Sequence, residues 1–509
     1  MTQAYKDPFR PQFHFTPEAN WMNDPNGMVY YEGEYHLFYQ YYPGGTTWGP
    51  MHWGHAVSRD LVRWEHLPVA LAPDDNGYIF SGSAVVDRQD SSGLFGGGSG
   101  LVAIFTHHRR NEETGEVSEC QSIAYSTDRG RSWTKYAGNP VLAEKGLQDF
   151  RDPKVFRHEP TNSWIMVIAA GDHIRLYRSP DLLGWTFASA FGSGDGSHDA
   201  VWECPDLFEL PVEGENGGKR WVLIVSIGDR PEGAEGSRTQ YFIGEFDGFR
   251  FLNENAPETI LWVDHGRDNY AGVTWSDIPD IDGRRIYLGW MSNWRYANQT
   301  PTVAWRSAMT VPRELGLRNG RQGVRLIQCP VRELQALRKK THCQTDLELT
   351  EAQKILDGCE EELLELAVDF RLGSSGSVGL RVRASDREET VIRYDAAAER
   401  LSMDRTRSGE VDFHPAFACR HEAPLSVEEG RLRLHLFLDT SSVEVFANDG
   451  ELVLTDLIFP HPDSRSLILF AEGEGAVVER LEVNALGSIY DPGSEAAKAD
   501  TARRQEAIR

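Results

Sequence analysis

A short unit repeats across the first 320 residues of the chain. Five apolar runs recur there, at 35–42, 101–108, 164–171, 221–228 and 285–292. Each run has the length of a buried strand and is too short for a typical helix. Ser-x-Asp turns that lead to a tryptophan follow three of the runs, at 58–64, 126–133 and 179–185, and a weaker fourth copy lies at 247–251. A repeat of this size, built from strands and turns, predicts a five-bladed β-propeller over residues 1–325.

The pattern changes beyond the repeats. Residues 431–450 alternate apolar and polar side chains and end in Asn448-Asp449-Gly450, a hairpin signal. Together with similar segments nearby, this predicts an antiparallel β-sandwich over residues 346–490, so the fold class is all-β. The stretch CPVRELQALRKK predicts a linker helix within 326–345, and the tail 491–509, rich in Ala, Lys and Arg, is expected to be frayed.

Charge and composition exclude several classes of partner. The chain has 52 Lys and Arg against 77 Asp and Glu, a formal net charge of −25, which argues against binding to nucleic acid or to an anionic membrane. There is no uninterrupted apolar run long enough for a transmembrane helix. The first residues have neither a basic region nor an apolar region of a signal peptide, so we expect a cytoplasmic protein; a secreted protein whose leader has been removed would begin in the same way.

A carboxylate followed by a proline opens three of the repeats. The motifs are Asp24-Pro25, Asp152-Pro153 and Glu203-Cys204-Pro205. Equivalent positions of successive blades lie at one radius around the channel of a propeller, so these three acids are predicted to converge. Asp-Pro is also ordinary turn chemistry, but three carboxylates in register favour catalysis. Two carboxylates that flank a bond, with a third that binds the ligand, are the usual equipment for glycoside hydrolysis.

The residues around these motifs suit a sugar. Tryptophan rings give apolar faces for the C–H groups of a sugar, although any one of them is as readily part of the core of a propeller; they are Trp21, Trp48, Trp53, Trp202 and Trp290. Asn23 and Gln40 are neutral groups suited to hydroxyls, or are interior amides. His52 with His55 and His107 with His108 lack a third metal ligand, and the glycines at 95–100 lack the lysine of a phosphate loop, so we expect neither a metal nor a cofactor.

Five segments together resemble glycoside hydrolase family 32, the β-fructosidases that include invertases, exo-inulinases and levanases. The segments are WMNDPNG (21–27), FSGSAV (80–85), RDP (151–153), WECPD (202–206) and WRSAMTVPREL (305–315). The resemblance covers almost the whole chain, since that family joins a five-bladed propeller to a β-sandwich. Residues 264–277 and 291–302 are more similar to the levanase and exo-inulinase branch than to sucrose-6-phosphate hydrolases.

The resemblance implies a role for each site residue. Asp24 matches the nucleophile, Glu203 the general acid/base and Asp152 the stabiliser of the transition state. Further residues match positions that contact the fructosyl unit: Asn23, Gln40, Trp48, Phe80, Ser81, Arg151 and Trp290. The implied reaction is a retaining double displacement, for which the two catalytic carboxyl groups should lie about 5–5.5 Å apart.

Two other functions fit the same pattern. A fructosyltransferase would differ only in whether water or a sugar hydroxyl reaches the intermediate, and a non-catalytic protein would use the scaffold to bind sugar. Intact Asp24 and Glu203 argue against the second of these. The sequence leaves open the preference for β-2,1 or β-2,6 linkages, the preferred chain length and the oligomeric state, for which an edge of the sandwich offers a dimer surface.

Overall fold

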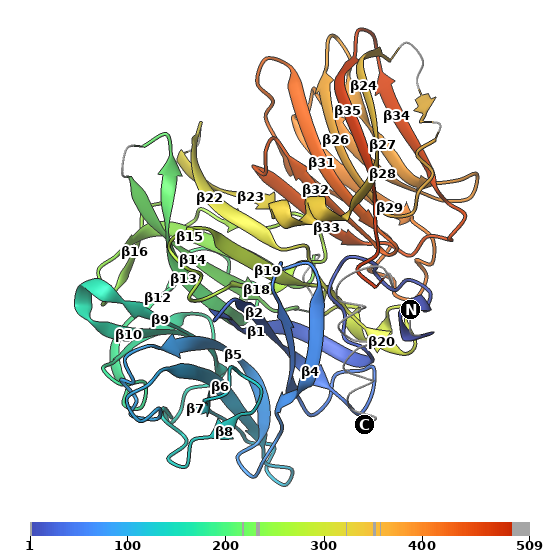
Figure 1. Cartoon of the computed structure of the whole chain (residues 1–509). Helices are drawn as coiled ribbons and strands as arrows, with labels where there is room; N and C mark the ends of the chain where they lie inside the picture. Colours follow the sequence, from blue (N-terminus) through green and yellow to red (C-terminus); the bar gives the residue numbers. More distant parts are fainter. Residues whose placement is uncertain are drawn as a thin grey trace.

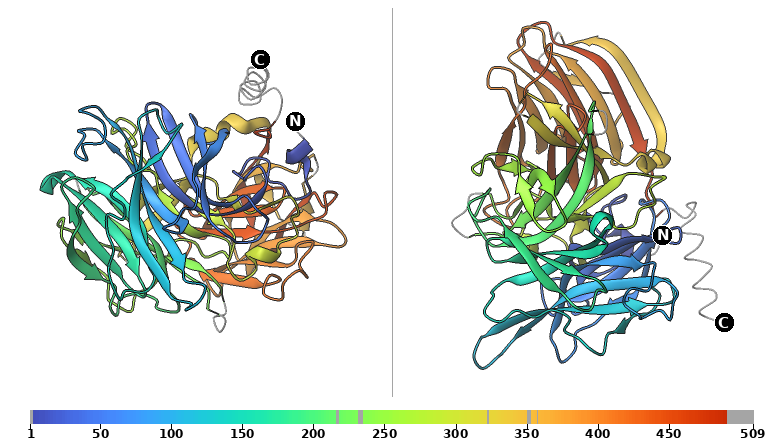
Figure 2. Two further views of the ribbon diagram at one scale, coloured as in Figure 1. Left: turned by 90° about the horizontal axis from the view of Figure 1, so that it is seen from below. Right: turned by 90° about the vertical axis from the view of Figure 1, so that its left-hand side faces the viewer.

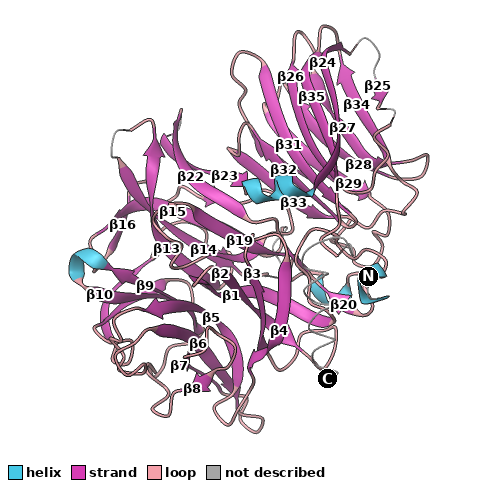
Figure 3. Cartoon of the chain, viewed as in Figure 1, coloured by secondary structure: helices cyan, strands magenta, loops and turns pink. Residues whose placement is uncertain are grey.

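The computed structural model describes residues 3–215, 218–230, 235–321, 323–349, 353–356 and 358–490. Two strand-rich parts make up the molecule, with residues up to about 330 below and the C-terminal part above (Figure 1). Among the described residues the helices are four short 3-10 turns, drawn in cyan in Figure 3, and none is long and apolar enough to cross a membrane. They are η1 (Gln3–Lys6), η2 (Glu159–Thr161), η3 (Ala297–Gln299) and η4 (Arg332–Leu337).

The N-terminal part consists of five antiparallel four-stranded blades. The first contains β1 (Asn20–Tyr31), β2 (Glu34–Tyr42), β3 (His52–Ser58) and β4 (Trp64–Leu71). The second contains β5 (Tyr78–Asp87), β6 (Gly100–Arg110), β7 (Val117–Ser126) and β8 (Thr134–Lys135). The third contains β9 (Phe150–His158), β10 (Ser163–Ala170), β11 (Ile174–Ser179) and β12 (Thr186–Phe191).

The last two blades share one hydrogen-bonded sheet, because β13 pairs with β22 in parallel. The fourth contains β13 (Trp202–Glu213), β14 (Lys219–Ile227), β15 (Arg238–Phe246) and β16 (Phe251–Asn253). The fifth contains β18 (Tyr270–Thr274), β19 (Arg285–Met291), β22 (Arg313–Gly320) and β23 (Gly323–Pro330). Three short strands pair with β15, β1 and β19: β17 (Leu261–Trp262), β20 (Trp305–Arg306) and β21 (Ala308–Met309).

The first strands of the five blades form a closed ring. Each contacts the next, from β1 to β5, β9, β13 and β18, and β18 returns to β1. The five apolar runs of the sequence are the second strands, β2, β6, β10, β14 and β19. These strands are almost entirely buried, which explains why they read as continuous apolar runs. The prediction of a five-bladed propeller is therefore confirmed.

The Ser-x-Asp repeat closes the third strand of three blades. In the first blade Ser58 Oγ donates to Asp60 Oδ1 at 3.1 Å, and Trp64 Nε1 donates to the carbonyl of Leu61 at 3.1 Å. The second and third blades repeat both bonds at equivalent residues. Each turn thus satisfies its own polar groups while its tryptophan packs against the blade.

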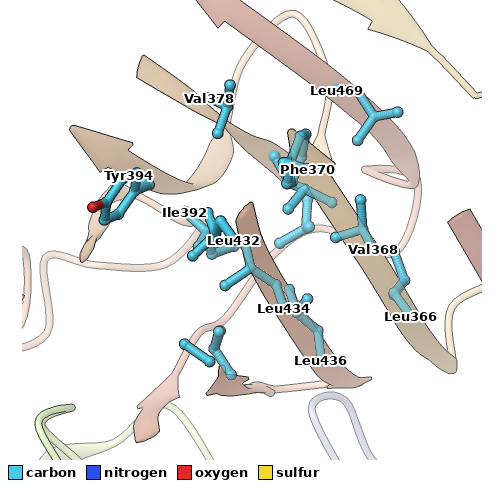
Figure 4. Close-up of a cluster of buried hydrophobic side chains, with 14 of the residues drawn as sticks. Leu366, Val368, Phe370, Val378, Ile392, Tyr394, Leu432, Leu434, Leu436 and Leu469 are labelled. Atoms are coloured by element: carbon cyan, nitrogen blue, oxygen red, sulfur yellow. The ribbon is translucent and has the colours of Figure 1, made fainter. Parts of the chain in front are cut away.

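The C-terminal part is a sandwich of two six-stranded sheets, shown above the propeller in the right-hand view of Figure 2. One sheet contains β24 (Arg338–Glu348), β35 (Val477–Leu486), β26 (Leu364–Arg371), β31 (Arg431–Asp439), β32 (Ser442–Ala447) and β33 (Leu452–Leu457). The other contains β25 (Gln353–Ile355), β34 (Ser466–Glu472), β27 (Ser377–Ala384), β28 (Glu389–Asp395), β29 (Arg400–Arg407) and β30 (Arg420–Pro424). Apolar side chains of both sheets, such as Leu434 and Ile392, fill the space between them (Figure 4).

The hairpin predicted at Asn448-Asp449-Gly450 joins β32 to β33, and all three residues have the positive φ that such a tight turn requires.

The predicted linker helix is wrong in extent. Only Arg332–Leu337 is helical, as the 3-10 turn η4, because Gly323–Pro330 pairs with β22 and Arg338 onwards pairs with β35. Strand pairing on both sides outweighs the weak helical propensity of this stretch. The sandwich accordingly begins at β24, before the predicted residue 346, and the predicted tail 491–509 lies outside the described residues.

Candidate active site

A β-bulge interrupts the first strand of every blade at the same level. At each bulge two residues of the first strand face one residue of the second: Asn23-Asp24, Phe80-Ser81, Asp152-Pro153, Cys204-Pro205 and Ala271-Gly272. A bulge bends its strand and redirects the side chains. Since the five strands surround one channel, the bulges present their side chains together near the amino-terminal ends of these strands. This explains how carboxylates more than 100 residues apart meet.

Asp24 is held at both carboxylate oxygens. Ser81 Oγ donates to Oδ2 at 2.7 Å, and Asn23 Nδ2 donates to Oδ1 at 2.9 Å. The Asn23 amide is itself oriented, because its oxygen accepts a bond of 2.7 Å from Trp21 Nε1. The carboxylate of Asp24, a residue only 8% exposed, is therefore fixed in rotation by two donors, one of which is itself held by Trp21.

Asp152 lies beside Asp24, with Cys204 between them. The Cys204 amide donates to Asp152 Oδ2 at 3.0 Å, and the Cys204 thiol lies 3.4 Å from Asp24 Oδ2 and 3.5 Å from Asp152 Oδ2. Both Asp152 and Cys204 have positive φ, at 65° and 47°, a conformation that non-glycine residues adopt rarely and that is common at functional sites. The bulges in β9 and β13 thus bring the second and third acidic motifs against the first.

Glu203 is clamped from the two neighbouring blades. Arg151 donates to Oε1 through Nη2 at 3.0 Å and Nε at 3.2 Å, and the Tyr270 hydroxyl donates to Oε2. Arg151 also pairs with Asp149 at 2.6 Å and lies 3.4 Å from Glu119. The Glu203 side chain is 22% exposed, so of the three acids it is the one that water or a leaving group reaches most easily.

Burial decides the electrostatics of the two aspartates. It raises the pKa of Asp24, against the hydrogen bonds from Ser81 and Asn23, and the negative charge of Glu203 raises that pKa further. Burial also raises the pKa of Asp152; the charge of Arg151 opposes this rise, while the charges of Glu203 and Asp24 add to it. The site therefore concentrates negative charge that one guanidinium offsets only in part.

Two aromatic rings remain accessible beside the acids. Trp48 is 41% exposed, its backbone amide donates to Asn298 Oδ1 at 2.9 Å, and its ring packs edge-on against Phe80 with the centroids 6.2 Å apart. Phe80 stacks on His108 at 4.1 Å. Trp48 and Phe80 thus form an aromatic pair at the bulge of β5.

Four of the five tryptophans noted in the sequence are core residues. Trp21, Trp53, Trp202 and Trp290 have no exposed surface, and Trp290 packs against Trp21 and Tyr270. These four side chains are therefore part of the core of the propeller in this structure. The contact of Trp290 with a sugar, which the family resemblance implies, stays a prediction.

Gln40, the remaining predicted site residue, and the histidines noted in the sequence are bonded to other groups of the propeller. Gln40 lies on β2 opposite the first bulge, buried, and donates to Asn26 Oδ1 at 2.7 Å and to the carbonyl of Ile79 at 3.1 Å. His55 bonds to His36 and His107 to Ser122, so these histidines are partners of other side chains. Within the described part of the chain, no group of three His, Cys, Asp or Glu side chains is arranged to hold a metal ion.

Sequence reasoning missed Tyr270 and the contacts of the Cys204 thiol. Tyr270 stands in β18 at the position that Glu203 holds in β13 and Arg151 in β9, the last paired residue before the bulge. Tyr270 lies 15 residues before the fifth apolar run, whereas Arg151 and Glu203 lie 13 and 18 residues before theirs, so an alignment on these runs does not bring the three residues into register.

A propeller with three convergent carboxylates in its channel and aromatic rings beside them defines a glycoside hydrolase. The chain belongs to the glycosyl hydrolases family 32: the model of the N-terminal domain of that family matches residues 14–330, and the model of the C-terminal region matches residues 333–485. The family resemblance of the sequence motifs is thereby confirmed.

Similar proteins cover nearly the whole chain. The levanase of Bacillus subtilis (strain 168) is 52% identical over 491 residues, which are 96% of this chain and 72% of the relative. The extracellular exo-inulinase of Aspergillus ficuum is 38% identical over 521 residues, and 96% of each chain is covered. The crystal structure of exo-inulinase from Aspergillus awamori aligns with a TM-score of 0.88 at 36% identity, over 95% of this chain and 99% of the other.

A further structure contains a fructosyl ligand. The β-fructofuranosidase of Schwanniomyces occidentalis, complexed with fructosyl-erythritol, aligns with a TM-score of 0.84 at 30% identity, over 96% of this chain and 99% of the other.

Proposed function

We propose that this protein is an exo-acting, retaining β-fructosidase that releases terminal fructose from fructans, fructo-oligosaccharides and sucrose. The observation that carries the proposal is the pairing of one fixed carboxylate, Asp24, with one clamped and partly exposed carboxyl group, Glu203, whose charge acts on Asp24. The names of the similar proteins, levanase, exo-inulinase and β-fructofuranosidase, support a fructoside as substrate.

In the first step, an Asp24 oxygen attacks the anomeric carbon of the terminal fructosyl unit while Glu203 donates a proton to the departing glycosidic oxygen. The bond from carbon to that oxygen breaks as the ester bond to Asp24 forms. The bonds from Ser81 and Asn23 hold the carboxylate in rotation, so little reorganisation is needed at the moment of attack.

In the second step, Glu203 takes a proton from a water molecule, and the resulting hydroxide attacks the same carbon and releases Asp24. Two inversions give retention. Arg151 and Tyr270 hold the two Glu203 oxygens and so orient the carboxyl group for both proton transfers.

Asp152 binds rather than transfers protons. Its Oδ2 accepts from the Cys204 amide, and its negative charge stabilises the oxocarbenium ion that develops in the transition state. A charged acceptor for sugar hydroxyls contributes roughly 1.5–3 kcal/mol per hydrogen bond, and more where the bonds tighten in the transition state. Trp48 and Phe80 offer their rings to the apolar face of the sugar.

A time course of products tests the proposal. Sucrose, 1-kestose, inulin and levan are supplied at matched fructosyl concentration, with Asp24→Asn as the inactive control, and the products are separated by anion-exchange chromatography. Free fructose released one unit at a time is the expected result, and the rates rank the linkages. Longer oligosaccharides would indicate a transferase, and no product from any substrate would indicate a binding protein.

A further inference from the structure

A second cavity lies on the other side of the channel from the three acids. Its volume is about 600 Å³, within the range of small-molecule sites, about 300–1,000 Å³. The later residues of β5, β9 and β13 line it, together with Ser276, Asp277 and Arg285 of the fifth blade. Because the same strands carry Ser81, Asp152 and Glu203 near their beginnings, the cavity and the catalytic site occupy opposite ends of one channel.

A buried polar layer separates the two sites. Lys154 Nζ donates to the carbonyl of Thr274 at 2.5 Å and lies 3.2 Å from Asp206 Oδ2, which also accepts from the amide and hydroxyl of Thr274. Ser83 Oγ donates to the carbonyl of Pro153 at 2.8 Å. This layer closes the channel, so a ligand of the cavity would not be in contact with Asp24 or Asp152.

Two charged groups of the cavity have unused hydrogen-bonding capacity. Asp206 has no exposed surface, yet its Oδ1 has no hydrogen-bond partner in the described part of the chain. Buried polar atoms without partners are rare and call for an explanation. Arg285 makes one long bond of 3.4 Å to the carbonyl of Trp275 and, among the described residues, no ion pair within 4.0 Å. Since the Asp206 oxygen is covered, the cavity offers the partly exposed guanidinium of Arg285 as its hydrogen-bond donor.

Aromatic rings also line the cavity. Phe156, Trp221 and Phe246 pack against one another with centroid separations of 5.0–6.2 Å, and the guanidinium of Arg285 lies 5.3 Å from the centroid of Phe208. Ring faces together with a few fixed polar groups are the combination that recognises the apolar and hydroxyl-bearing sides of a sugar.

The charge balance excludes an anion. Six carboxylates line the cavity, namely Asp87, Glu159, Asp206, Glu209, Asp247 and Asp277. Four basic residues also line it: Arg88, Lys154, Arg157 and Arg285. An excess of negative charge, in a chain whose formal net charge is −25, repels phosphate or sulfate and leaves a neutral polyhydroxylated ligand as the best match.

We propose that this cavity is a second, non-catalytic site that binds a neutral saccharide of one or two sugar residues, with Arg285 as its polar anchor. The proposal concerns binding and does not depend on the fructosidase activity.

Isothermal titration calorimetry with the full-length Asp24→Ala variant tests the proposal, because sugars are then not consumed. The probes are fructose, glucose and sucrose, with inorganic phosphate as the anionic comparison. Two cavity variants are added to this background: Arg285→Leu, which removes the donor, and Gln89→Trp, which narrows the mouth at an exposed residue and has little effect on folding. Unchanged thermal unfolding is required of both variants.

We expect two binding sites for at least one sugar in the Asp24→Ala background. One of them should be weakened at least about tenfold by Arg285→Leu, which removes one charge-assisted hydrogen bond, and also weakened by Gln89→Trp, which obstructs entry. A single site that neither cavity variant changes would overturn the proposal, as would binding of phosphate in place of sugar. If the cavity site is present but no fructoside is hydrolysed by the unmodified chain, the proposed function fails and the present inference stands.

Discussion

Two clusters of buried carboxylates, one in the channel and one at the junction between propeller and sandwich, use the same residue types for opposite purposes. At the junction Asp264, Asp439 and Glu444 each face a basic side chain. Arg313 donates to Asp264 at 3.0 Å and to Glu444 at 2.5 Å, while the two nitrogens of His14 bond to Asp439 at 2.7 Å and to Glu444 at 2.8 Å. All these side chains are almost completely buried.

The two clusters shift carboxyl pKa values in opposite directions. Burial alone would raise the pKa of Glu444, but the charge of Arg313 and the hydrogen bond from His14 lower it below its usual value. In the channel, burial and neighbouring acids raise the pKa of Asp24 and Asp152. At the junction, the pairing of each of these carboxylates with a basic side chain holds the two domains together. In the channel, the carboxylates are paired only in part, which leaves them reactive and lowers the stability of the protein.

The largest expected effect comes from the channel. Asp24→Ala should lower kcat by about 10⁴-fold or more, since no other group can form the ester intermediate. The protein should be no less stable to heat than the unmodified chain, because a buried carboxylate among acids is removed. Fructose release and thermal unfolding are measured together. A kcat within tenfold of the original value would refute the role of Asp24.

The next largest effect is on stability at the junction. Arg313→Met leaves Asp264 and Glu444 buried without their cation and should lower the free energy of unfolding by about 3–5 kcal/mol. The matched control is Arg318→Met, which breaks an exposed pair with Glu213 and should cost less than about 1 kcal/mol. Denaturant unfolding compares the two variants, and equal losses would mean that burial of the pair is irrelevant.

Asp152→Asn keeps the shape of the channel and removes one charge. We expect kcat to fall by about 10²–10³-fold, since the charged acceptor acts mainly in the transition state. Asp149→Asn is the control, because Asp149 is half exposed and reaches the site only through Arg151. Turnover of Asp152→Asn similar to that of this control would contradict the assigned role.

The smallest expected effect is a change of stability with pH, which arises at the junction and not in the channel. Burial lowers the pKa of His14, but the hydrogen bonds and charges of Asp439 and Glu444 more than offset this and raise the pKa from 6.5 to about 9. A raised pKa in the folded state stabilises the protein fully below about pH 6.5, and this contribution, on the order of 3 kcal/mol, is lost as the pH rises through about 9. Unfolding between pH 6 and 10 should show this loss in the original chain and a flatter profile in His14→Gln, and identical profiles would rule out protonated His14.

The sequence predicted the second strands of the blades better than the first. Second strands such as β6 and β10 are buried on both faces, so their apolar runs are conspicuous. The first strands contain proline, glycine and charged residues at the bulges, and these residues obscure a strand pattern. Only the carboxylate followed by a proline, which opens three of these segments, indicated that they are equivalent.

What the sequence could not show depends on tertiary pairing. The linker helix was predicted from local propensity, yet pairing of its flanks with β22 and β35 left only η4. Tyr270 escaped attention because a tyrosine in a strand is ordinary, and its meaning comes from its place beside Glu203 in the ring of blades. The second cavity has no signal in the sequence, since its wall combines side chains from four blades.

The most direct test of the account is to trap the covalent intermediate. Glu203→Ala is mixed with a fructosyl donor whose leaving group needs no protonation, the reaction is quenched with acid, and the peptides are analysed by mass spectrometry. The account predicts a fructosyl unit attached to the peptide that contains Asp24, because attack proceeds while deprotonation of water is lost. A fructosyl unit on another peptide, or release of a product with inverted configuration and no labelled peptide, would contradict it.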